Sequence, residues 1–162
     1  RLALEGGRDA VDVCKTNGFK YYLAMANVLT GWATAAEGDV SAGLLQLREG
    51  LEELRHLAAE LRLPFYLTLL AETLGRAGET GQALANISTA FAFATKNGEE
   101  WVVPEIHRVQ GDLLKIEGGL DAAHASYLRA VSYARRVGSA AFEHRSSHWA
   151  AGTAKPASLE RF

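Results

Sequence analysis

The sequence predicts an all-α fold, specifically a right-handed α-solenoid of antiparallel helix pairs with a 40-residue repeat. Alanine and leucine are abundant and alternating β-branched stretches are nearly absent, which favours helix over strand. Apolar residues lie three and four positions apart, as in amphipathic helices. Small residues also recur every 40 positions, as stacked repeat units require where backbones meet. The recurring sets are Gly38, Gly78 and Gly118, and Gly31, Ala71 and Gly111.

Each predicted unit holds two helices. The full units are expected at about 24–63, 64–103 and 104–143. In the third unit, Pro104 opens the first helix, where a missing N–H costs nothing. That helix ends at Gly118-Gly119, and the second runs from Asp121 to about Gly138.

The first two units follow the same order. Pro64 opens the first helix of the second unit, which ends near Gly78, and its second helix ends at Asn97-Gly98. In the first unit, the first helix ends at Gly38, and leucines through Leu57 mark the second.

The repeat pattern continues toward both ends of the chain. Residues 1–18 are expected to be a partial unit, and residues 144–151 a partial unit within a helix over 140–151. The prediction is thus a single helical-repeat domain over 1–151 and a flexible tail over 152–162. Since the pattern begins and ends inside repeats, the chain is expected to be a fragment of a longer protein.

The composition argues against several classes of function. A net charge of −2 and a pI of about 6.2 disfavour direct nucleic-acid binding. The longest apolar run, 63–71, is too short for a membrane span and contains Pro64. The lone Cys14 fits a reducing, cytoplasmic compartment.

The small-large-small pattern resembles tetratricopeptide repeats, whose signature places small residues around one bulky residue. Its best copy here is Gly111, Ala123, Tyr127 and Ala130. The usual tetratricopeptide unit has about 34 residues, so the longer unit here implies roughly one extra turn in each helix.

Two further strings resemble the C-terminal helical repeats of bacterial multidomain signalling ATPases. Residues 101–116 read WVVPEIHRVQGDLLKI, and residues 132–151 read SYARRVGSAAFEHRSSHWAA. In that family, an ATPase is joined to a class III adenylate cyclase or to a DNA-binding regulator domain. The resemblance therefore implies a module of a signal-transduction or transcription-regulating protein. It transfers no ATPase or cyclase activity, because those domains are not in this sequence.

No catalytic, metal or cofactor site is predicted. His144 and His148 share a helix face, but no third ligand is placed by the sequence and the zinc-protease spacing is absent. Cys14 falls on a packing position of the repeat. The glycines are spread between helices rather than gathered into a phosphate-binding loop.

The resemblance to tetratricopeptide folds implies a concave groove lined by the first helix of each unit. The groove positions transferred to this sequence are Met25, Val28, Trp32, Phe65, Thr68, Glu72, Arg76, Glu105, Arg108, Asp112 and Lys115. Such a surface suits an amphipathic peptide or helix. The alternative is structural: Glu72, Arg108 and Asp112 pair across units. Trp32 is either an exposed hot-spot residue or a plug beside Gly31.

We therefore expect a non-catalytic protein-interaction, scaffold or sensor module of a larger bacterial signalling or transcription-regulating ATPase. Its partner is a protein or peptide, including another domain of the same parent chain. A stand-alone tetratricopeptide adaptor that binds a peptide or helix is the alternative. Self-association through open repeat ends is also expected, because cut ends expose apolar faces.

Overall fold

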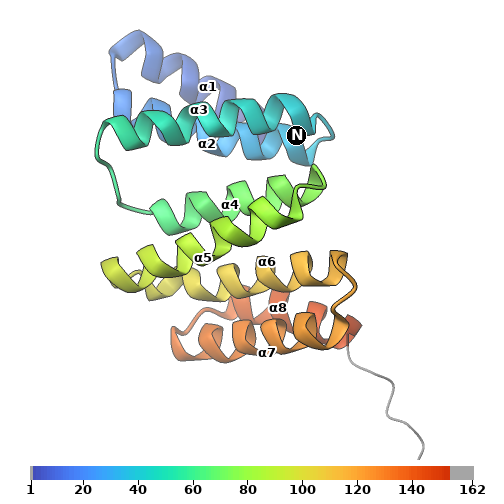
Figure 1. The fold of residues 1–162 in the computed structure, drawn as a ribbon. Helices are drawn as coiled ribbons and strands as arrows, with labels where there is room; N and C mark the ends of the chain where they lie inside the picture. The colour runs from blue at the N-terminus through green and yellow to red at the C-terminus, as the bar shows by residue number, and fades with distance from the viewer. Residues whose placement is uncertain (1, 154–162) are drawn as a thin grey trace, which may run out of the picture.

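The computed structural model describes residues 2–153, and every regular element found there is helical (Figure 1). No strand occurs in this part of the chain. The all-α prediction is therefore confirmed. The elements are α1 (Leu2–Asn17), α2 (Lys20–Ala36), α3 (Val40–His56), α4 (Leu63–Arg76), α5 (Thr80–Asn97), the 3-10 helix η1 (Glu100–Val102), α6 (Val103–Ile116), α7 (Leu120–Arg136) and α8 (Ala140–Thr153).

Local chemistry explains most helix ends. Pro64 and Pro104 lie in the first turns of α4 and α6, where their missing N–H is tolerated. Asp39 caps α3, since its Oδ1 accepts a hydrogen bond from the amide of Ala42 at 3.1 Å. Asp121 is a first-turn residue of α7, and Gly119 occupies the capping position.

Six helices are followed by a glycine with positive φ, which closes the turn to the next helix. These glycines are Gly18, Gly38, Gly78, Gly98, Gly118 and Gly138. The turn after α3 differs, because Ala58 stands 40 residues from both Gly18 and Gly98. Ala58 has a φ of 50°, so a residue with a Cβ is held in the left-handed region that favours glycine.

The helices pack as successive neighbours. The pairs α2/α3, α4/α5 and α6/α7 make the closest associations, and α8 packs on α7. In addition, α4 contacts both α2 and α6, and α6 contacts α8. These four helices form a row, called here the first-helix row. We call the contact between α2/α3 and α4/α5 the first junction, and that between α4/α5 and α6/α7 the second junction (Figure 1).

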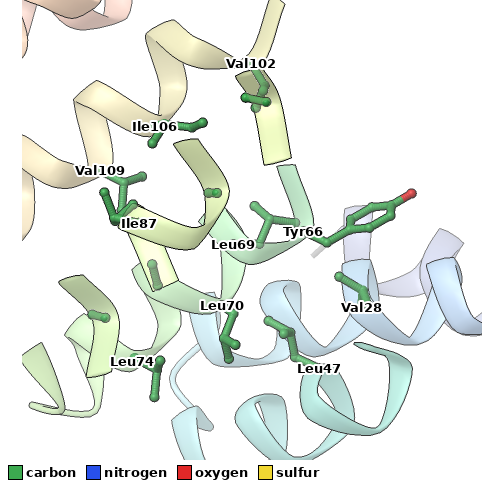
Figure 2. Packing of buried hydrophobic residues seen from close by; sticks show 14 of the residues in the cluster. Val28, Leu47, Tyr66, Leu69, Leu70, Leu74, Ile87, Val102, Ile106 and Val109 are labelled. Carbon is green, nitrogen blue, oxygen red and sulfur yellow. The ribbon is translucent and has the colours of Figure 1, made fainter. Parts of the chain in front are cut away.

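One apolar core runs through these pairs from α2 to α6. It includes Val28, Leu47, Tyr66, Ile87 and Ile106, one from each successive helix (Figure 2). Each such side chain contributes about 1.5–3 kcal/mol when fully buried. A Cβ on Gly31 would lie 2.6 Å from the Gly43 oxygen and 2.6 Å from the Leu47 nitrogen, so α2 and α3 meet backbone to backbone.

The predicted C-terminal boundary needs a correction. Gly152 and Thr153 were expected in the flexible tail, but both belong to α8. Residues 154–162 of that predicted tail lie outside the described residues. The predicted partial unit 144–151 lies within α8. Within residues 2–153, no helix combines the length and the hydropathy that crossing a membrane requires.

Candidate functional site

Arg108 of α6 lies at the centre of a cluster of charged side chains on the first-helix row. Its Nη2 donates to Glu105 Oε1 at 2.9 Å and to Glu72 Oε1 at 3.4 Å. Its Nη1 donates to Asp112 Oδ2. Glu105 and Asp112 lie one turn on either side of Arg108, whereas Glu72 belongs to α4. One guanidinium group therefore joins carboxylates of two helices across the second junction.

The cluster continues into neighbouring helices. Glu72 Oε2 accepts a hydrogen bond from the Trp32 indole at 2.7 Å, and Arg76 donates to Glu72 Oε1 at 3.3 Å. Arg145 Nη2 of α8 lies 3.2 Å from Glu105 Oε2. Tyr127 of α7 donates to Asp112 Oδ1 at 2.7 Å. We call the full set the Arg108 network; its members are Trp32, Glu72, Arg76, Glu105, Arg108, Asp112, Tyr127 and Arg145.

Burial makes the centre of the Arg108 network a low-dielectric ion cluster. The side chains of Arg108 and Glu105 are each 7% exposed. Burial alone would lower the pKa of Arg108, but the hydrogen bond from Glu105 and the charges of Glu105, Glu72 and Asp112 outweigh it and raise that pKa. Arg108 therefore stays cationic and its charge is matched inside the fold.

Asp112 and Tyr127 respond to the same environment. Burial raises the pKa of Asp112, although Arg108 and the Tyr127 hydroxyl oppose that rise. Burial also raises the pKa of Tyr127, and the adjacent Asp112 carboxylate adds to the rise. The neutral hydroxyl is therefore the donor to Asp112, and this contact ties α7 to α6.

The predicted groove residues divide by exposure. Val28 is fully buried in the core, and Glu105 and Arg108 are also buried, so we correct the prediction that these three line an open groove. Thr68 is buried too, and its hydroxyl donates to the Pro64 carbonyl at 2.7 Å. The remaining positions are half-buried or exposed: Met25, Trp32, Phe65, Glu72, Arg76, Asp112 and Lys115.

The alternative interpretation of Glu72, Arg108 and Asp112 as pairing partners matches the observed contacts. Trp32 fits neither simple alternative, since it packs against the core while its indole N–H binds Glu72. The sequence analysis did not identify Tyr127 or Arg145 as members. A signal for Arg145 existed, because it stands 40 residues after Glu105, at the groove position of α8.

The Arg108 network contains three carboxylates and three guanidinium groups, so its formal charges balance. These groups already bind one another, which suits a structural link rather than acid–base chemistry. Elsewhere among the described residues, no group of three histidine, cysteine or acidic side chains is arranged as metal ligands. Cys14 is buried.

Comparison with known proteins adds no family assignment. No protein-family model matches the sequence, and no curated protein matches it.

Proposed function

We propose that this chain is a right-handed, tetratricopeptide-like α-solenoid that binds a protein partner. In this proposal it is a non-catalytic scaffold or sensor module of a larger bacterial signalling or transcription-regulating ATPase. The observation that carries the proposal is the contact between equivalent positions along the first-helix row. Trp32 binds Glu72, and Glu105 binds Arg145, each pair being 40 residues apart. Stacked repeat units bring equivalent positions together in this way.

The exposed part of the first-helix row is cationic and aromatic. Arg76 and Lys115 are exposed, and the side chain of Arg145 is 52% exposed. Lys115 Nζ lies 5.5 Å from the centre of the Trp149 ring, and Trp149 is itself exposed. The carboxylates of the row are paired within the Arg108 network. A complementary partner is therefore a peptide or helix that carries acidic and apolar side chains.

The surface is tested with a charge-matched pair of double variants. Arg76→Ala/Lys115→Ala removes two cations from the row, whereas Lys15→Ala/Arg129→Ala removes the same two residue types from the exposed faces of α1 and α7. Each tagged chain is expressed in its source cells, and captured proteins are quantified by mass spectrometry. We expect a partner retained by wild type and control but reduced about tenfold or more with the row variant. Equal capture by both variants would contradict the proposed surface.

The parent protein is tested separately, by immunoblotting source cells with an antibody raised against this chain. The module proposal requires a native species much larger than 17.5 kDa. A species near that mass would instead favour a stand-alone tetratricopeptide adaptor that binds a peptide or helix. The partner of a larger protein includes another domain of the same parent chain. The proposal includes a cytoplasmic location and neither a cofactor nor direct nucleic-acid contact.

Self-association is part of the same proposal. Val13, Phe19 and Tyr22 of the α1–α2 region are 57%, 52% and 61% exposed, and they border an apolar hollow between these helices. An apolar end of this kind favours stacking of two chains. Sedimentation velocity over rising concentration is expected to show dimers or larger species. A strict monomer at high concentration would rule out this part of the proposal.

A further inference from the structure

A hollow of about 530 Å³ lies at the first junction, between α3, α4 and α5. It is separate from the Arg108 network. Its walls are mostly apolar and include Leu51, Leu54, Leu63, Leu67, Leu70 and Phe93. Two cations and two anions stand among its lining residues, namely Arg48, Arg55, Glu52 and Glu60. Formally, the hollow is therefore an apolar space with a neutral border.

The corresponding place at the second junction contains three rings in contact. Leu51, Leu67 and Phe93 of the hollow are each followed 40 residues later by an aromatic or imidazole side chain. His107 lies between the other two, with ring centres 4.7 Å from Phe91 and 5.5 Å from Tyr133. The central ring of the second junction thus corresponds to the smaller Leu67 at the first. A ring-sized difference in filling separates two otherwise equivalent sites.

The segment that borders the hollow, residues 57–62, is held in a defined conformation. Lys96 Nζ of α5 donates to both carboxylate oxygens of Glu60, at 2.8 and 2.7 Å. The amide of Arg62 donates to Glu99 Oε1 at 3.2 Å. Both Ala58 and Arg62 have positive φ, at 50° and 61°. Strained backbone that surrounding contacts fix in place is typical of binding sites.

We propose that this hollow binds an uncharged small molecule built around an aromatic ring. The volume lies within the range of small-molecule sites, and the walls supply the apolar contact that a ring requires. The balanced charges at the border give no preference for an anion or a cation. The rings at the second junction show which shape fills this space in the same helical surroundings. The inference goes beyond the proposed function and does not depend on partner binding at the first-helix row.

Indole is the probe, and its binding is measured by saturation-transfer NMR and by amide chemical-shift titration. We expect saturable binding with shifts centred on the walls of the hollow. Leu67→Phe places a ring where His107 stands at the second junction, so it is expected to weaken indole binding about tenfold or more. The control is Leu45→Phe, which adds the same ring on α3 at a position that is 61% exposed and outside the hollow.

Circular dichroism melting first establishes that Leu67→Phe is folded. If it is not, Leu51→Phe replaces it, because phenylalanine already occupies the equivalent position 91. The proposal is overturned if indole does not saturate, if shifts centre on the α1–α2 hollow around Cys14, or if the folded filled variant binds as wild type does. Octan-1-ol provides the remaining control, and equal affinity for its flexible chain would overturn the preference for an aromatic ring.

Discussion

Replacing Arg108 with methionine tests whether the Arg108 network is a structural link. Methionine keeps an unbranched apolar stem while it removes the guanidinium group that contacts three carboxylates. Glu72 keeps Trp32 and Asp112 keeps Tyr127 as hydrogen-bond donors. Glu105 is left with its charge 7% exposed and only the distant edge of Arg145 nearby. Most of the cost therefore comes from Glu105.

Leaving one buried charge without its partner costs about 3–5 kcal/mol. That is a large share of the roughly 5–15 kcal/mol by which a domain is stable. Arg76→Met is the control, since Arg76 also binds Glu72 but lies at the surface, where an ion pair is worth about 0–1 kcal/mol. The double variant Glu105→Met/Arg108→Met removes both buried charges and is expected to recover most of the loss.

The assay is urea unfolding followed by far-ultraviolet circular dichroism at pH 7, with the denaturant slope fitted for each variant. Arg108→Met should lower the free energy of unfolding by about 3–5 kcal/mol, and Arg76→Met by less than about 1 kcal/mol. Similar losses in the two variants would refute the argument that burial gives Arg108 its weight. A double variant no more stable than Arg108→Met would show that the unpaired Glu105 is not the source of the cost.

Three further predictions concern positions outside the charged centre. Ala58→Gly should raise the free energy of unfolding by about 0.5–1 kcal/mol in urea, because relief of left-handed strain exceeds the added chain entropy; Gly98→Ala should lower it. Gly111→Ala should lower it by about 1–3 kcal/mol, since a Cβ would lie 2.5 Å from the Tyr127 ring; an unchanged urea midpoint would contradict this contact. Burial lowers the pKa of His107 below 6.5, so its stabilising contribution is present above that pH and is lost as pH falls through the folded-state pKa. His107→Phe should therefore flatten the decline in melting temperature from about pH 6.5 to 5, and parallel declines would contradict it.

The helices could be predicted from sequence because their ends depend on local chemistry. Gly118 stops α6 in the left-handed conformation, and Pro104 marks its first turn. Both signals lie within one segment, so no knowledge of packing is needed to interpret them. The turn at Ala58 shows the limit, since only the three-dimensional surroundings hold an alanine in that conformation.

The candidate site could be predicted only in part. The spacing correctly places Glu72, Arg108 and Asp112 on the first-helix row and allows them to pair. It does not give their exposure, because burial of Arg108 depends on how closely α4 and α6 approach. The hollow was missed for a related reason. Leu67 and His107 occupy equivalent positions, and the difference in volume matters only once neighbouring helices surround them.

The unequal filling of the two junctions has a consequence for cooperativity. Arg108 and the rings around His107 join α4 and α5 to α6 and α7 by both charge and packing. The first junction combines the Trp32–Glu72 bond with a hollow, so less contact surface couples its two sides. In a row of helices, each neighbour interface decides how far local opening spreads. We therefore expect amide hydrogens of α1–α3 to exchange as one group ahead of those of α4–α7, with the boundary at residues 57–62.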